Sequence, residues 1–477
     1  MIISTIYKNK KIGVLGLGKA GIFAAYSMIL GGAKVLAWDD SIKLDEPIQN
    51  QLLKDFLSAN QKDFLLNAID NNSLVIQNLS LIVKDLSALF VTPGIGIMPP
   101  KQHPIASAAL KNHIPLISDF DLLWNKCKNA CYIGITGTNG KSTTTALLGH
   151  IFKEAGKETE VGGNIGTSVL DLKELNSDGF YILEASSFQL ERLNETVFNT
   201  AILLNITPDH LDRYNSFEDY ISAKACLFNR QSSSDYAIIS IDCPNAAAIY
   251  NKLKIANISN IVPISCLSLL DDGISLIDGC IYIKFKGSNT KLDFGHSKWI
   301  PGAHNQQNIL AAFTAAFLNG LDPKIVIKTI HTFKGLEHRM KLVHEYNGLK
   351  FVNDSKATNV DACEKALQTY DDIYWIAGGI SKDSGIESLS GLFHKIKHAF
   401  LVGTAAKEFS YVLEKYNIPY TISHTLENAM SDIQSLQPTQ GVVLLSPACA
   451  SLDQWKNFEE RGNAFSNISQ RWDTLNQ

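Results

Sequence analysis

The sequence predicts an α/β protein in which helices cover parallel sheets and the chain is divided among three domains. Strand-like apolar runs alternate with helical stretches along almost the whole sequence, which is typical of parallel sheets built from β-α-β units. With 477 residues, the chain also exceeds what one ordinary hydrophobic core holds. Glycine-rich turns follow two of the apolar runs, at the kind of place where α/β sheets bind their ligands.

Three successive sets of apolar runs define the expected domains, with boundaries near Asp119 and Gly335. Between roughly Ile238 and Lys298 the pattern changes to alternation, as in GISLIDGCIYIKF, whose Asp-Gly pair favours a hairpin turn. We therefore expect a small antiparallel flap on the second domain. The expected domains cover residues 1–118, 119–335 and 336–477.

Composition and charge favour a globular protein that acts on small molecules. The chain is 45% hydrophobic and 19% charged, with a net charge of -4. It has no dense stripe of basic residues with interleaved aromatics, so we expect no nucleic-acid partner. The start MIISTIYKNKK lacks a secretory signal, and the longest apolar run, Ala20 to Ala33, is too short to span a bilayer. We expect a cytoplasmic monomer with no membrane partner.

The cysteines do not predict a metal site. The eight cysteines include no Cys-x-x-Cys pair, and Cys127 and Cys131 lack a nearby second pair of ligands. We expect most of the eight to be small buried hydrophobic residues in a reducing compartment.

The first domain begins with a glycine motif between two strands. Lys11–Leu15 is the first expected strand, Ala20–Leu30 a helix and Val35–Trp38 the second strand. The Gly-x-Gly-x-x-Gly motif that begins at Gly16 permits a tight turn, lets the backbone approach a diphosphate and packs the helix on the strand. The motif indicates a nucleotide site without naming the nucleotide, so the NAD(P) site of a dehydrogenase stays open here.

The second domain contains a phosphate loop in the segment ITGTNGKSTTTALL. The strict P-loop has glycine where this chain has Ile135, but the glycines still let N–H groups point at phosphate oxygens. A helix that begins near Lys141 adds its dipole, the Lys141 ammonium reaches the terminal phosphates, and the Ser142 hydroxyl can bind Mg²⁺. A glycine-rich turn before an ordinary helix is the alternative. The residues expected at the nucleotide are Gly137, Thr138, Asn139, Gly140, Lys141, Ser142 and Thr143.

Three further residues of the second domain are candidates for the metal and its surroundings. The segment YILEASSFQL places Glu184 where an apolar strand ends, and Mg²⁺ prefers oxygen ligands, so we favour metal binding over a surface charge. The segment LLNITPDHLDRYNSFEDYISAKACLF adds His210 and, on the following helix, Lys224. Taken singly, such a histidine is usually an ordinary core or surface residue and such a lysine is usually solvated.

Together these stretches resemble the Mur ligase family, the ATP-dependent amide-forming enzymes of peptidoglycan precursor synthesis, which have three α/β domains and the loop GTNGKST. The resemblance covers nearly the whole chain. It implies a Rossmann-like first domain that binds a UDP substrate and a central P-loop-type ATPase domain. It also implies a Rossmann-like third domain, with strands at LKFVND, DIYWIAGG, HAFLVG and GVVLLSPA, that binds an amino acid and closes on ATP.

The resemblance implies two Mg²⁺ sites beside ATP. It places Lys141 at the γ-phosphate and gives one metal to Ser142 and Glu184. It gives the second metal to His210 and implies that Lys224 is carbamylated. An ammonium repels Mg²⁺, whereas a carbamate presents oxygens as a carboxylate does.

The resemblance also implies ATP contacts further along the chain. The segment PGAHNQQNILAA contains Asn305 and Asn308, of which Asn308 is expected at the adenine. Arg339 of GLEHRM and Asp354 of NDSKATN are expected at ATP as well. An amphipathic helix with two exposed asparagines is the alternative for the first of these segments.

In the third domain, NDSKATN and SPACASLDQWKNFEERG resemble the family members that add D-glutamate. Cations and hydroxyls suit a dicarboxylate, because they pair with both carboxylates. One of the cations, in AGGISKDSG, lies where a plain strand-to-helix turn is the alternative. The residues implied at D-glutamate are Lys356, Thr358, Lys382, Ser451 and Phe458.

The resemblance assigns the first glycine motif to the uridine nucleotide of the substrate. The backbone of the turn is expected against the diphosphate, and the acidic pair after the second strand near the uracil or ribose. The residues implied at this substrate are Gly18, Lys19, Ala20, Asp39, Asp40, Thr92, Gly94, Asn164, Gln189 and His210.

The implied reaction joins D-glutamate to UDP-N-acetylmuramoyl-L-alanine. The substrate carboxylate attacks the γ-phosphorus of ATP, and the D-glutamate amine displaces phosphate from the acyl phosphate. We expect the third domain to swing about the Gly335 region, which excludes water from this intermediate. The alternatives are a dehydrogenase, a nonenzymatic ATP-binding switch, another member of the family and an enzyme like folylpolyglutamate synthase.

Overall fold

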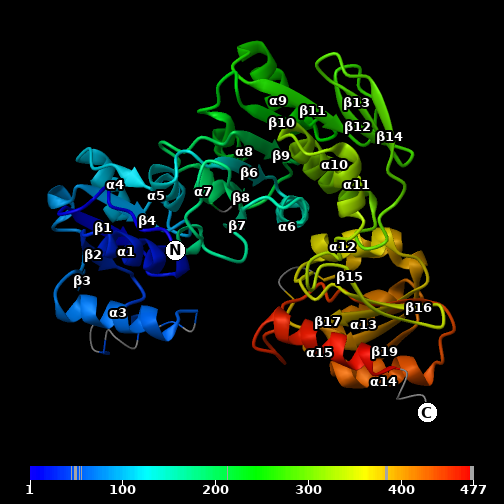
Figure 1. Ribbon diagram of the computed structural model, residues 1–477. Coiled ribbons are helices and arrows are strands. Elements are labelled where there is room, and N and C mark those ends of the chain that lie inside the picture. Colours follow the sequence, from blue (N-terminus) through cyan, green and yellow to red (C-terminus); the bar gives the residue numbers. More distant parts are fainter. Residues whose placement is uncertain are drawn as a thin grey trace. The chain divides into compact units, whose positions relative to one another are not determined.

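The computed structural model describes residues 1–43, 46–47, 51–52, 54, 56–211, 213–381 and 385–472. Three sheets follow one another along the chain, each with helices packed on it, so the predicted α/β class is confirmed (Figure 1). The chain forms two compact units. The first contains Met1–Phe294 and Gln307–Thr329, and the second contains Gly295–Gln306 and Ile330–Gln477. The division of the first unit near Asp119 stays a prediction.

The first sheet has five strands, all parallel. The strands are β1 (Lys11–Leu15), β2 (Lys34–Trp38), β3 (Leu74–Ile76), β4 (Ala88–Val91) and β5 (Leu116–Ile117), and the helices are α1 (Lys19–Leu30), α3 (Ala59–Asp70) and α4 (Pro104–Lys111), with a 3-10 turn at Val83–Asp85. The order β3-β2-β1-β4-β5 reverses between β1 and β4. The turns after these two strands therefore lie at the topological switch point, where sheets of this kind bind ligands.

The second sheet has nine strands. They are β6 (Cys131–Thr136), β7 (Thr159–Gly163), β8 (Phe180–Glu184), β9 (Thr200–Leu203), β10 (Tyr236–Ser240), β11 (Asn260–Ser265), β12 (Gly273–Ile277), β13 (Cys280–Lys284) and β14 (Thr290–Asp293). The helices are α5 (Asp119–Lys126), α6 (Lys141–Glu154), α7 (Ser187–Leu190), α8 (Phe217–Ala225), α9 (Pro244–Ala256), α10 (Ala303–Leu318) and α11 (Pro323–Ile330), with 3-10 turns at Val169–Asp171 and Cys226–Phe228. The order is β14-β13-β12-β11-β10-β9-β6-β8-β7, so β6 lies between β9 and β8.

The antiparallel flap is smaller than predicted. β10 and β11 are parallel strands joined by α9, and antiparallel pairing begins only with β12. The apolar residues of β10 and β11 are buried in a continuous run, which is typical of a parallel strand covered on both faces. The hairpin turn at the Asp-Gly pair is confirmed, because Asp278 and Gly279 have φ of 48° and 72° between β12 and β13.

The third sheet has six strands, and its first strand is antiparallel to the second. The strands are β15 (Lys341–Tyr346), β16 (Leu349–Asn353), β17 (Ile373–Gly378), β18 (Ile396–Val402), β19 (Tyr420–His424) and β20 (Gly441–Leu445), and the helices are α12 (Val360–Thr369), α13 (Ala406–Lys415), α14 (Leu426–Ser435) and α15 (Phe458–Gln470), with a 3-10 segment at Glu387–Lys395. The order is β15-β16-β20-β17-β18-β19. Successive residues of β17 face opposite sides: Trp375 packs in one buried cluster and Ile376 in the other.

Side-chain caps set the start of many of these helices. Each cap accepts a hydrogen bond from a backbone N–H of the first turn, which has no partner within the helix. The capping residues are Ser58, His103, Ser118, Ser186, Ser216, Asn359, Thr425 and Asn457.

The burial of the cysteines and the length of the apolar helices bear on two expectations for the whole chain. All eight cysteines are free thiols, but only Cys127, Cys363 and Cys449 are buried and the other five are partly exposed, so the expectation of mostly buried cysteines is wrong. Within the described ranges, no helix has both the length and the apolar character needed to cross a bilayer.

Candidate functional site

The glycine-rich turn after β1 is shaped as the motif predicts. Gly16 has φ of +91°, and its amide donates a hydrogen bond to the Trp38 carbonyl oxygen at 2.7 Å. A Cβ on Gly21 would lie 1.9 Å from the Gly16 carbonyl oxygen, so only glycine lets α1 approach this closely. A Cβ on Gly18 would meet no atom within 4 Å. The space above Gly18, at the N-terminus of α1, is open.

An acidic pair after β2 borders this turn. Asp39 Oδ2 accepts a hydrogen bond from the Leu17 amide at 2.7 Å. Burial raises the pKa of Asp39, but this bond and those from Ser41 outweigh burial, so the pKa lies below its ordinary value. Asp40 Oδ2 lies 2.9 Å from Nε2 of His103, and this hydrogen bond is the main cause of a lowered pKa of Asp40. Asp39 therefore stabilises the glycine turn, a role that the sequence does not show.

Other residues predicted at the UDP substrate lie around the same turn. Thr92 directly follows β4, and a Cβ on Gly16 would lie 2.1 Å from its Oγ1, so the two are in close contact. A Cβ on Gly94 would meet nothing within 4 Å. Lys19 begins α1, with Ala20 beside it, and its Nζ donates to the Gly166 carbonyl oxygen at 2.7 Å.

The predicted phosphate loop connects β6 with α6. Its two glycines have positive φ, +157° at Gly137 and +87° at Gly140. Asn205, which closely follows β9, holds the loop: its carbonyl oxygen accepts from the Thr138 amide at 2.9 Å and its Oδ1 from the Asn139 amide at 2.8 Å. Sequence reasoning missed Asn205, although its place just after an apolar strand is a usable signal.

Lys141 begins α6, as predicted, so the positive end of the helix dipole points at the loop. Its Nζ donates to the carbonyl oxygens of Gly137 at 3.0 Å and Thr138 at 2.8 Å. The ammonium therefore lies over the loop. Ser142 and Thr143 follow in the first turn of the same helix and are partly exposed.

The predicted adenine residue packs against the loop. Asn308 is buried, and its Oδ1 accepts a hydrogen bond from Thr144 Oγ1 at 3.2 Å. A Cβ on Gly140 would lie 2.2 Å from this same oxygen. Asn305 is buried as well, so the alternative of two exposed asparagines on an amphipathic helix is wrong.

Lys224 is a buried lysine beside the loop, with 2% of its surface exposed. Its Nζ donates a hydrogen bond to the Gly137 carbonyl oxygen at 2.8 Å. Burial, and next the charge of Lys141, hold the pKa of Lys224 well below its usual range, although Asp209 and Glu184 oppose this. The alternative of a solvated helix lysine is therefore wrong.

Glu184 ends β8 and is also buried. Its Oε1 accepts from Asn164 Nδ2 at 2.8 Å, whereas its buried Oε2 has no hydrogen-bond partner within the described part of the chain. A buried carboxylate oxygen without a donor fits a bound cation. Gln189 is turned to its own helix, because its Oε1 accepts from the amide and hydroxyl of Ser186, both at 3.1 Å.

His210 differs from its predicted partners in being half exposed. It has φ of +53°, its ring centroid lies 4.9 Å from that of Phe188, and its Nε2 lies 3.5 Å from Asp209 Oδ2. Among the described residues, no three His, Cys, Asp or Glu side chains form a group that could hold a metal. The predicted ligand set includes a serine and a modified lysine, so its assignment stays a prediction.

In the second unit, Asp354 follows β16 as a buried carboxyl group. Burial raises the pKa of Asp354 to about 7, although nearby groups, Arg339 among them, lower it in part. Its oxygens accept from Ser446 Oγ at 2.8 Å and from the Met340 amide at 3.1 Å. The structure thus places Arg339 and Asp354 close together, and their assignment to ATP stays a prediction.

Four residues predicted at D-glutamate lie in two adjoining segments. The Nζ of Lys356 lies 4.4 Å from the ring centroid of Phe458, a cation-π contact. The amide of Thr358 donates to the Lys356 carbonyl oxygen at 2.8 Å, and Ser451 is buried. The fifth predicted residue, Lys382, lies outside the described residues.

Arg461, which sequence reasoning missed, joins the same two segments. Its Nε donates to Ser355 Oγ at 3.0 Å, and its Nη2 donates to the carbonyl oxygens of Ser355 at 2.8 Å and Cys449 at 3.2 Å. Burial lowers the pKa of Arg461 to about 10. Its place three residues after Phe458 on α15 is a signal that it shares the same helix face.

Comparison with protein families gives two matches. The family described as Mur ligase middle domain matches residues 135–316. The family described as Mur ligase, glutamate ligase domain, matches residues 338–449.

Comparison with curated proteins gives relatives over the full length. A UDP-N-acetylmuramoylalanine--D-glutamate ligase of Paramagnetospirillum magneticum is 39% identical over 478 residues, 99% of this chain and 99% of the relative. One of Rickettsia prowazekii is 37% identical over 472 residues, 98% of this chain and 99% of the relative.

Solved structures of low sequence identity share the fold. MurC, a UDP-N-acetylmuramate-alanine ligase of Thermotoga maritima, has a TM-score of 0.53 at 15% identity, covering 98% of this chain and 100% of that chain. MurF of Acinetobacter baumannii has a TM-score of 0.54 at 16% identity, covering 93% of this chain and 87% of that chain.

Proposed function

The chain belongs to the Mur ligase family, and from this premise we propose that it joins D-glutamate to UDP-N-acetylmuramoyl-L-alanine in an ATP-dependent reaction. Relatives named for this ligation match it over nearly its full length. The product is an amide, and the reaction belongs to peptidoglycan precursor synthesis.

The surroundings of the phosphate loop support this proposal best. Lys141 and Lys224 both donate to the Gly137 carbonyl oxygen, and Lys224 and Glu184 are buried. A lowered pKa leaves more of the Lys224 amine neutral, and the neutral amine is the form that reacts with CO₂ to give a carbamate. A loop that only bound a nucleotide would have no need of a buried lysine.

Mg²⁺ is the cofactor that these residues fit, and when bound it supplies positive charge to the phosphoryl and carboxylate oxygens. The orphaned Oε2 of Glu184 and the hydroxyl of Ser142 suit one site. His210 and the carbamate of Lys224 would hold a second Mg²⁺. The assignment of two sites is part of the proposal.

The first step joins the carboxylate of UDP-N-acetylmuramoyl-L-alanine to ATP. A carboxylate oxygen forms a bond to the γ-phosphorus while the bond to the β-phosphate oxygen breaks, which gives an acyl phosphate and ADP. Both reactants are anionic, so the Lys141 ammonium and the dipole of α6 lower the barrier by neutralising charge. No side-chain nucleophile is required.

The second step forms the amide. The amine of D-glutamate attacks the acyl carbon, loses a proton, and phosphate leaves. Lys356, Thr358, Ser451 and Phe458 are proposed to bind the amino acid, with the Lys356 ammonium pairing with a carboxylate of D-glutamate. Lys382 belongs to the same proposal. The residues proposed at ATP are Gly137, Thr138, Asn139, Gly140, Lys141, Ser142, Thr143, Asn308, Arg339 and Asp354.

The first sheet is proposed to bind the uridine diphosphate. The open space above Gly18 and the N-terminus of α1 support this, because such a terminus attracts phosphate. We also propose that the protein acts on these small molecules as a monomer in the cytoplasm. The other residues proposed at this substrate are Lys19, Ala20, Asp39, Asp40, Thr92, Gly94, Asn164, Gln189 and His210.

The proposal is tested by measuring phosphate release from ATP with each substrate omitted in turn. We expect release only with UDP-N-acetylmuramoyl-L-alanine and D-glutamate together, and little with L-glutamate. Release that does not require D-glutamate would overturn the assignment. Addition of L-glutamate to a folate acceptor would instead identify a folylpolyglutamate-synthase-like enzyme, and a change in nicotinamide absorbance would identify a dehydrogenase.

A further inference from the structure

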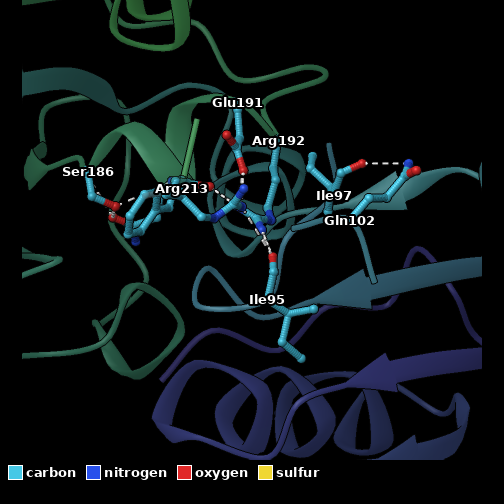
Figure 2. Close-up of polar contacts among 9 residues, drawn as sticks. Ile95, Ile97, Gln102, Ser186, Glu191, Arg192 and Arg213 are labelled. Carbon is cyan, nitrogen blue, oxygen red and sulfur yellow. Dashed lines mark hydrogen bonds and ion pairs between the residues drawn. The ribbon is translucent and has the colours of Figure 1, made fainter. Parts of the chain in front are cut away.

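Two buried arginines, one just after α7 and one between β9 and α8, contact the loop between β4 and α4. We call residues 92–102 the substrate loop, because Thr92 and Gly94 are proposed to bind the UDP substrate. The Ile95 carbonyl oxygen accepts a hydrogen bond from Nη2 of Arg192, and Nη2 of Arg213 lies 3.5 Å from the same oxygen. Figure 2 shows both guanidinium groups beside Glu191 and Ile95.

The arginine pair, Arg192 and Arg213, has an excess of positive charge. Their side chains are 2% and 7% exposed. A single carboxylate oxygen, Oε1 of Glu191, lies 3.0 Å from Nη1 of Arg192 and 2.8 Å from Nη2 of Arg213. The buried Nε atoms of both arginines have no hydrogen-bond partner among the described residues. Two cations thus share one carboxylate, and such a buried arrangement is often less stable than apolar packing, so a role other than stability is a reason for its presence.

Each arginine lies close in sequence to a residue proposed at the UDP substrate. Arg192 is three residues after Gln189, and Arg213 is three residues after His210. The Phe188 ring contacts both Arg213 and His210: its centroid is 5.2 Å from the guanidinium carbon of Arg213 and 4.9 Å from the ring centroid of His210. Arg213 therefore packs on the same ring as His210.

The substrate loop has further contacts that limit its motion. Nδ2 of Asn215, two residues after Arg213, donates to the Pro99 carbonyl oxygen at 3.1 Å. Within the loop, Nε2 of Gln102 donates to the Ile97 carbonyl oxygen at 2.9 Å (Figure 2). The arginine pair contacts the loop just after Gly94, and Asn215 contacts it further along.

We propose that Arg192 and Arg213 are positioning residues for the UDP substrate. They hold the substrate loop at a fixed place relative to Gln189 and His210, so that both sides of the binding site are formed before the substrate arrives. Their unbalanced positive charge also favours a diphosphate nearby. This inference rests on the proposed function, since it assumes that the UDP substrate binds between these residues.

Kinetics of an Arg192→Met variant test the proposal, with Arg230→Met as the matched control because Arg230 is exposed in the same unit. We expect KM for UDP-N-acetylmuramoyl-L-alanine to rise about tenfold or more, while KM for ATP and kcat stay within about twofold. Arg192→Lys keeps the charge and part of the hydrogen bonding, so its KM should lie between wild type and Arg192→Met. Wild-type KM values in folded Arg192→Met, or an equal rise for all three substrates, would overturn the proposal.

Hydrogen exchange without substrate gives a second, independent measurement. In Arg192→Met and in Arg213→Gln, amides of residues 92–102 should exchange faster, while those of β6 and α6 stay as in wild type. Unchanged exchange in the loop, or faster exchange throughout the unit, would contradict a positioning role. Because this comparison needs no turnover, it still tests the arginine pair if wild-type protein fails the phosphate-release assay and the proposed function falls.

Discussion

The Nζ of Lys224 lies 2.8 Å from the carbonyl oxygen of Gly137, so a buried amine faces the loop proposed to bind phosphates. The same Nζ also lies 4.7 Å from the ring centroid of Tyr220. Because burial disfavours the charged form, the site is suited to an amine that reacts with CO₂ and thereby gains oxygens.

We predict that Lys224→Ala loses activity by about 100-fold or more, because the carbamate proposed to hold the second Mg²⁺ is removed, and with it positive charge that would stabilise the transition state. A short carboxylic acid should restore part of the activity by replacing the carbamate. The control is Lys153→Ala, an exposed lysine of α6, which should retain wild-type activity. Phosphate release measures all three, and full activity of Lys224→Ala would refute the role.

The glycines of the first turn give a matched pair of variants. Gly21→Ala places a Cβ 1.9 Å from the Gly16 carbonyl oxygen, so we expect it to lower the free energy of unfolding by about 1–3 kcal/mol. Gly18→Ala meets no atom, so its stability should match wild type, while KM for the UDP substrate rises because the methyl group lies where the diphosphate approaches. Thermal unfolding and initial rates separate the two effects. Unaltered KM in Gly18→Ala would place the diphosphate elsewhere.

Asp354 predicts a pH dependence of stability. Its pKa is about 7 in the folded protein against an ordinary value of 3.8, so the folded state binds more protons between these pH values. The free energy of unfolding should therefore fall as pH rises from about 4 to 7, by on the order of 1–4 kcal/mol, and level off above. In Asp354→Asn this decline should be smaller, and the part that remains is the contribution of Asp119, whose pKa burial raises to about 6. Denaturant unfolding of both proteins across this range is the measurement, and parallel pH profiles would contradict the assignment.

Variants of Phe458 and Lys356 should lose D-glutamate binding selectively. Lys356→Met should raise KM for D-glutamate by about tenfold or more, because it removes a charge that pairs with a carboxylate. Phe458→Leu should raise it by about 2- to 30-fold, the range of one cation-π contact. KM for the UDP substrate should stay unchanged in both. Lys350→Met, an exposed lysine of β16, is the control, and equal effects of Lys350→Met and Lys356→Met would argue against the site.

Local patterns were sufficient to predict much of the fold and the local structure around several candidate site residues. The glycine turn at Gly16 and the start of α6 at Lys141 follow from residue types within a few positions. The same holds for the strand ending at Glu184 and the hairpin at Asp278. In each, a short stretch has one favourable backbone conformation, because glycine permits positive φ or because an apolar run ends at a polar residue.

Only the tertiary structure revealed which distant residues meet. Asn308 packs against Thr144, 164 residues earlier, and Arg192 contacts Ile95, 97 residues earlier. The continuation of the second sheet through β10 and β11 and the burial of Lys224 likewise depend on which strands and helices become neighbours. Such contacts depend on how the strands pair and the helices pack. The residue types in a short stretch of sequence do not specify which residue a hundred positions away becomes a neighbour.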